Sequence, residues 1–137
     1  MNPSAPSSPA LSKATPSRWP SWLLSAATAS ALFPLVFAIA FYGEYLLAWL
    51  QLGHAPLPSL NDPKDIHPWL HLGVSVLFLC LPGALLVSLI TSISAILLKL
   101  ETTSRRAMRI GASLALWVLL CALLRSDPFG VVGWWMD

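Results

Sequence analysis

Three long apolar runs, separated by short polar segments, define the pattern of this chain. Residues 21–53 contain a single charged side chain, Glu44, and residues 72–98 and 110–124 contain none. An uncharged run of about 18 or more apolar residues is long enough to cross the roughly 30 Å hydrocarbon core of a bilayer as a helix. The pattern predicts an all-α integral membrane protein with three transmembrane helices, at about residues 21–52, 69–98 and 106–125.

The segments outside these runs carry turn formers and interfacial residues. Residues 1–20 contain five Pro and five Ser without an apolar period, which predicts a disordered tail. Residues 53–68 are rich in Pro and predict an outer loop, and residues 126–137 predict an interfacial C-terminal segment with Trp134 and Trp135 at the headgroup level. Residues 21–137 then form a single three-helix membrane domain.

Cleavage of the first run as a signal peptide is the alternative to an uncleaved span. The tripeptide Ala38-Ile39-Ala40 resembles a cleavage site. The apolar run before it is longer than the roughly 7–15 residues of a signal peptide, and apolar sequence continues to Leu52. An uncleaved first span is therefore the preferred interpretation.

Composition and charge agree with lipid as the solvent. Charged residues make up 10% of the chain, whereas soluble domains are about 25% charged. A net charge of +2 gives no indication of nucleic-acid binding. With the N-terminus inside, six of the eight Lys and Arg residues lie on the cytoplasmic side, and Lys64 and Arg125 lie outside. This bias predicts N-terminus in and C-terminus out, in a bacterial cytoplasmic (inner) membrane.

Small residues at four-residue spacing suggest where the helices pack. Such pairs let helix backbones approach closely in lipid, so they predict tight packing in the cytoplasmic half, with a self-association face as the alternative. The pairs are Ala27 and Ala31, Ser88 and Ser92, and Gly111 and Ala115. In the outer half, an aromatic stripe at the same spacing predicts core or lipid-facing packing; its members are Phe33, Phe37, Phe41, Tyr45 and Trp49.

Ionisable residues gather near the predicted outer face. Glu44 and Arg125 are each the lone charge near the outer end of a span, which suggests an interfacial ion pair. His67 and His71, with Asp62 or Asp65, are candidate zinc ligands. The preferred interpretation gives Asp62 a role in the turn before Pro63 and makes Asp65 the cap of the second span.

The sequence contains no recognised catalytic, nucleotide-binding or cofactor-binding motif, and the span interiors contain no Asp, Glu, Lys or Arg. We therefore expect no catalytic residues and no cofactor. The expected role is that of a non-enzymatic accessory or assembly subunit, acting through helix packing and an outer-face loop. Its expected partners are the lipid bilayer and other membrane proteins or further copies of itself. A component of a small channel or transporter, possibly homo-oligomeric, is the alternative.

The charge bias gives a direct test of orientation. A cysteine introduced at Ser59 should react with an impermeant reagent added from outside, because Ser59 lies in the predicted outer loop. A cysteine introduced at Thr103 should react only after permeabilisation. The reverse labelling pattern would contradict the orientation.

Overall fold

The computed structural model describes residues 20–98 and 103–136, and these residues form helices and short connections without a strand. Most of the predicted N-terminal tail, together with Lys99 and Glu101, lies outside the described residues. The five helices, in chain order, are α1 (Ser21–Leu52), α2 (Pro63–Ile66), α3 (Pro68–Leu97), α4 (Thr103–Ser126) and α5 (Val131–Met136).

The three long helices agree with the apolar runs in the sequence. Each is long and apolar enough to cross a membrane, over Trp22–Leu52, Pro68–Leu97 and Ser104–Ser126. This confirms the expected all-α architecture with three candidate spans and supports an integral membrane protein. The helix ends fall close to the predicted ones because charge and turn formers bound each run.

Local residue chemistry sets the helix ends. Gly53 ends α1 in the left-handed conformation (φ 73°), and its N–H donates to the Trp49 carbonyl at 2.9 Å. Asp62 caps α2 by accepting the Lys64 N–H at 2.8 Å, with Pro63 in the first turn. The predicted loop therefore contains a short helix, and Asp65 lies within it instead of capping α3.

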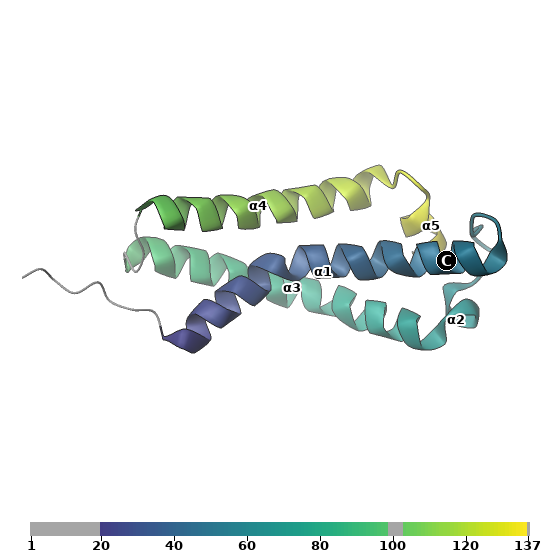
Figure 1. The fold of residues 1–137 in the computed structure, drawn as a ribbon, viewed down its shortest axis with the longest axis horizontal. Helices are drawn as coiled ribbons and strands as arrows, with labels where there is room; N and C mark the ends of the chain where they lie inside the picture. Colours follow the sequence, from purple (N-terminus) through teal and green to yellow (C-terminus); the bar gives the residue numbers. More distant parts are fainter. Residues whose placement is uncertain (1–19, 99–102, 137) are drawn as a thin grey trace, which may run out of the picture.

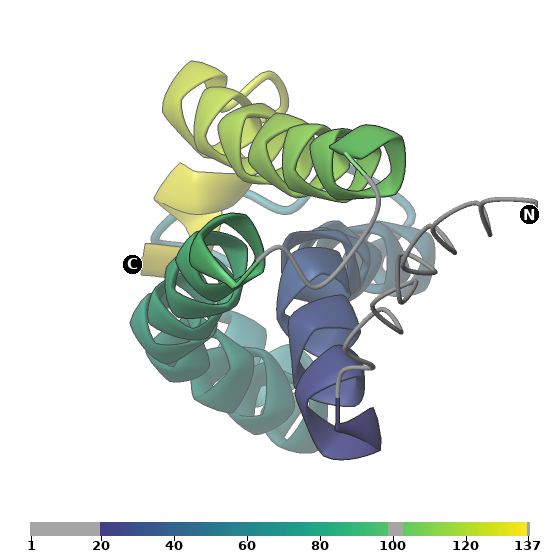
Figure 2. The ribbon, with the colours of Figure 1, turned by 90° about the vertical axis from the view of Figure 1, so that its left-hand side faces the viewer.

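The long helices run up, down and up as a bundle, with α2 and α5 at one end (Figure 1). Helix α1 contacts both α3 and α4, whereas α3 and α4 contact each other least. The part of α1 before Pro34 turns away from α4 (Figures 1 and 2). Proline has no N–H for the Ser30 carbonyl, which explains why the helix bends there.

The main hydrophobic core lies at the end of the bundle that carries α5. The α1 aromatics Phe37, Phe41 and Tyr45 are buried there. They pack with residues of three other helices, namely Val74 of α3, Leu120 of α4, and Val131 and Trp134 of α5. Aromatic rings pack within this core: Phe37 and Phe41 stack with centroids 5.5 Å apart, and Tyr45 and Trp134 meet edge to face with centroids 5.4 Å apart.

This core corrects two expectations from the sequence. The most extensive packing of large side chains lies at the α5 end, not at the end with the small-residue pairs. The C-terminal segment also folds back into the bundle, since Trp134 is only 1% exposed. Phe129 and Met136 do remain exposed, as a segment at an interface would predict.

The three small-residue pairs differ in how far they are buried. Ala27 and Ser88 are buried, and Ala31 and Ser92 are half-buried. Gly111 and Ala115 are exposed, and a side chain added at Gly111 would meet no atom within 4 Å. The prediction that this last pair packs against a neighbouring helix is therefore wrong for the single chain.

The rotation of α4 explains that error. The hydroxyl oxygens of Ser88 in α3 and Ser113 in α4 lie 2.8 Å apart, so Ser113 marks the face of α4 that meets α3. Gly111 and Ala115 lie two residues to either side of Ser113, about 200° around a helix of 3.6 residues per turn. The face with Gly111 and Ala115 thus points away from α3.

The core can be tested with Phe37→Ala. Phe37 is 0% exposed, and its truncation should lower the free energy of unfolding by about 2 kcal/mol in a detergent titration. We expect less than the roughly 3–5 kcal/mol typical of soluble cores, because separated helices keep the ring in lipid and lose only packing. Ile39→Ala, on the exposed face of the same helix, is the control and should change stability by less than about 0.5 kcal/mol. Equal losses in both variants would contradict the assigned core.

Candidate functional site

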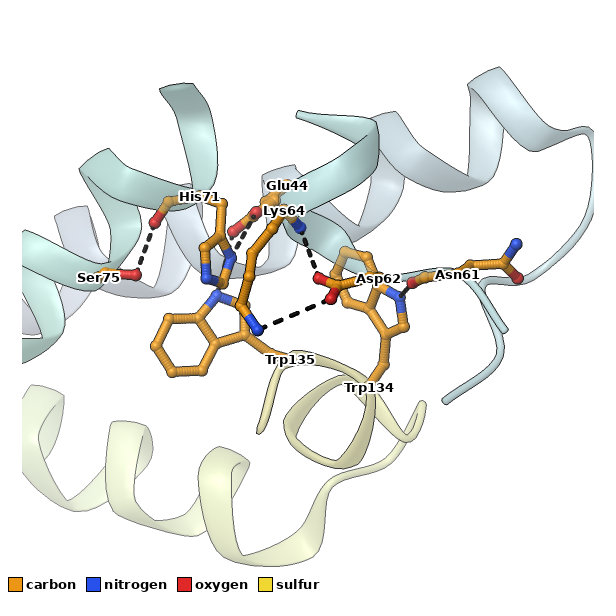
Figure 3. Close-up of polar contacts among 8 residues, drawn as sticks. All are labelled: Glu44, Asn61, Asp62, Lys64, His71, Ser75, Trp134 and Trp135. Carbon is orange, nitrogen blue, oxygen red and sulfur yellow. Dashed lines mark hydrogen bonds and ion pairs between the residues drawn. The ribbon is translucent and has the colours of Figure 1, made fainter. Parts of the chain in front are cut away.

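The strongest concentration of polar chemistry surrounds Glu44 in α1. Glu44 is 1% exposed, although it lies within an otherwise uncharged helix. Its Oε1 lies 3.2 Å from Nδ1 of His71 in α3, and its Oε2 accepts the indole N–H of Trp135 in α5 at 3.2 Å. The carboxyl group thus joins three helices, as Figure 3 shows. We call Glu44, His71 and Trp135 the polar latch.

Contacts of its backbone carbonyl and of its ring hold His71 in place. Its carbonyl accepts the Ser75 hydroxyl at 2.8 Å, one turn further along α3. Its ring also packs on Trp135, with centroids 5.2 Å apart. An indole N–H can only donate, so Oε2 of Glu44 must be an acceptor. An ionised Glu44 then accepts at both oxygens, with the His71 Nδ1–H as the second donor.

A second set of hydrogen bonds holds α5 over the end of the bundle. The Trp134 indole N–H donates to the Asn61 carbonyl in the loop before α2. The Tyr45 hydroxyl donates to the Phe129 carbonyl at 3.3 Å, just before α5. These contacts tie the C-terminal segment to both α1 and the 53–62 connection. Figure 3 shows the contact between Trp134 and Asn61.

Asp127 directs the chain from α4 into α5. Its backbone adopts a positive φ of 39°, a conformation that Asp tolerates better than most residues. Its two carboxylate oxygens accept the N–H groups of Val132 at 2.9 Å and Gly133 at 3.2 Å. This carboxylate therefore satisfies free donors in the first turn of α5.

An open hollow of about 410 Å³ lies beside this region. It is lined by residues of the 59–65 segment and by Trp134. Asp62 and Asp65 supply carboxylates to it, and Asp62 also pairs with Lys64 at 3.7 Å. Glu44 is buried, so the hollow does not expose the latch carboxylate.

The candidate zinc ligands take separate roles. Asp62 caps α2, Asp65 is exposed in its first turn, and His67 joins α2 to α3. His71 faces Glu44. Within residues 20–98 and 103–136, no group of three His, Cys, Asp or Glu residues is arranged to hold a metal ion.

The predicted ion pair between Glu44 and Arg125 is not formed. Arg125 is exposed in the last turn of α4, whereas Glu44 is enclosed by His71 and Trp135. The predicted pair was based on each residue being the lone charge near the outer end of its span. An imidazole and an indole also form hydrogen bonds with a carboxyl group, and these are the partners of Glu44 in the structure.

Geometry favours a structural role for the latch over catalysis. Both carboxylate oxygens are used inside the fold, and the donors come from helices far apart in the sequence. A group buried in this way stabilises the position of α5 but offers no surface to a substrate. The exposed acids at the neighbouring hollow are the groups at this end that a partner can reach.

The latch predicts a specific coupling energy. A double-mutant cycle combining Glu44→Gln with His71→Phe should show about 1–3 kcal/mol of coupling in unfolding, because the pair is buried. The matched cycle of Glu44→Gln with Arg125→Gln should show coupling near zero. Coupling to Arg125 as strong as coupling to His71 would contradict the latch.

Comparison of the chain with family models, with curated proteins and with solved structures found no match. The functional interpretation therefore rests on the geometry of the described residues. Those residues place a closed polar latch and an open acidic hollow at one end of a three-helix bundle.

Proposed function

We propose that this protein is a non-enzymatic accessory or assembly subunit of a complex in a bacterial cytoplasmic membrane. The observation that carries the proposal is the outward face of α4, where Ala107, Gly111 and Ala115 recur at four-residue spacing and are exposed. A side chain added at Gly111 meets no atom within 4 Å, so the backbone is open to close approach. We call these three residues the α4 small face.

The partner of the small face is a transmembrane helix of another protein. In lipid, helices gain little hydrophobic energy from meeting, so association depends on close backbone contact and interhelical hydrogen bonds. The small face offers such contact and is exposed in the part of the chain that the structure describes. The hollow beside α2 offers carboxylates to an extramembrane part of the same partner.

A closed latch supports a scaffold role. Glu44, His71 and Trp135 hold α5 against α1 and α3, which keeps the end of the bundle rigid. A rigid end presents the exposed segment around Asp62 and Asp65 in a fixed position relative to the helices. Fixed presentation reduces the entropy cost of binding a partner.

Gly111→Leu tests the proposal. The added side chain should block close helix contact and lower recovery of the native complex in mild detergent by about tenfold, which corresponds to about 1.4 kcal/mol. Gly83→Leu is the matched control, since Gly83 is also an exposed helical glycine with no atom within 4 Å of an added side chain. Recovery and partner composition should be measured by quantitative cross-linking and pull-down of the full chain.

The outcomes of that experiment distinguish assembly through the small face from the alternatives. Loss with Gly111→Leu and retention with Gly83→Leu supports assembly through the small face. Equal recovery of the same complex from both variants contradicts it. A complex made only of copies of this chain, again lost with Gly111→Leu, would favour the homo-oligomeric channel or transporter component instead.

A further inference from the structure

A narrow apolar groove separates α3 from α4 at the end of the bundle opposite α5. Its volume is about 170 Å³, and its walls include Leu89, Ile93 and Ile96 of α3 and Ile110, Leu114 and Trp117 of α4. Ser88 and Ser113 also line it and are joined by their 2.8 Å hydrogen bond, so their hydroxyl groups are occupied. The groove therefore presents hydrocarbon on a helix surface that is apolar enough to face lipid.

Arg106 places a positive charge at one end of this groove. Arg106 lies four residues before Ile110 and on the same side of α4 as Ser113 and Trp117, by the three- and four-residue spacing of a helix. One guanidinium nitrogen of Arg106 donates to the carbonyls of Ala95 at 3.2 Å and Ile96 at 3.4 Å, in the last turn of α3. The Arg106 charge is thereby fixed where Ile96 and Ile110 close the groove.

The charge around this end is strongly one-sided. Arg105 and Arg109 flank Arg106 in the first turns of α4. The carboxylates among residues 20–98 and 103–136 belong to the other end of the bundle, at Glu44, Asp62, Asp65 and Asp127. Outside the described residues, Lys99 and Glu101 cancel in formal charge.

We propose that this groove binds one anionic phospholipid. An acyl chain lies between Leu89, Ile93 and Leu114, and the phosphate contacts the arginine cluster led by Arg106. Guanidinium groups bind phosphate with charge-assisted hydrogen bonds, and basic sites between transmembrane helices select anionic headgroups. The guanidinium of Arg106 donates to the α3 carbonyls, and Arg105 beside it is exposed.

The charge at the end of the groove favours a lipid over another helix. An anionic phospholipid carries both an acyl chain for the apolar walls and a phosphate for the arginines, whereas an uncharged transmembrane helix has no phosphate. The groove adjoins the small face, because Leu114 of the groove lies seven residues, about two helical turns, from Ala107. The lipid site uses the groove and the arginine charge, which the proposed assembly role does not need.

Native mass spectrometry of the full chain, released from mild detergent, tests the lipid site. The probes are phosphatidylglycerol and phosphatidylcholine with identical acyl chains. We expect the wild-type chain to retain one phosphatidylglycerol about fivefold more than phosphatidylcholine, which corresponds to about one favourable arginine contact. Inorganic phosphate should not displace the lipid, because it lacks the acyl chain.

Five variants separate the headgroup contact from the acyl contact. Arg106→Gln should reduce the preference for phosphatidylglycerol to near unity, whereas Arg106→Lys and Arg125→Gln should retain it. Ser92→Phe should reduce retention of both lipids by filling the groove, because Ser92 is one of its lining residues. Ile90→Phe, on an exposed side of the same helix, should leave both unchanged.

Three results would overturn the proposal. Equal retention of the two lipids by the wild-type chain would remove the headgroup selectivity. Unchanged retention of both lipids by Ser92→Phe would remove the groove as the site, even if Arg106→Gln failed to fold. A dimer that loses its association in Ser92→Phe would assign the groove to a second copy of the chain.

Discussion

The buried carboxyl group of Glu44 constrains the rest of the structure. A carboxylate placed in a long apolar helix is costly unless donors reach both of its oxygens. The donors come from His71 near the start of α3 and from Trp135 in α5. The last residues of the chain must therefore fold back across the end of the bundle. The left-handed turn at Asp127 and its cap on α5 make that return possible.

The return of α5 also explains why the bundle has two unlike ends. Where Val131 and Trp134 enter, the aromatic stripe of α1 finds large partners and forms the main core. At the other end α1 bends away from α4 at Pro34, and small side chains and the Ser88–Ser113 hydrogen bond provide the packing (Figure 1). Since α3 and α4 contact each other less than either contacts α1, a groove is left between their larger side chains.

The long helices could be predicted from the sequence because hydrophobic length and flanking turn formers depend on local residues alone. Pairing of Glu44 could not, since it brings together residues separated by up to 91 positions. The rotation of α4 about its own axis could not be predicted from the sequence either. In lipid both the packed and the exposed faces are apolar, so the periodicity that orients a soluble helix is missing. Gly111 and Ala115 show this, because their spacing favours packing but does not say against which helix.

The two surfaces of α4 follow from that same rotation. Ser113 faces α3, and this brings Ile110 and Trp117 to the groove while it turns Gly111 and Ala115 outward. One helix thus carries part of the apolar groove and, beside it, an exposed face of small residues. Because the polar latch fixes α5 at the far end and involves no residue of α4, changes on either surface leave the latch contacts in place. The fold separates the interactions that hold the chain together from the surfaces that it offers to its surroundings.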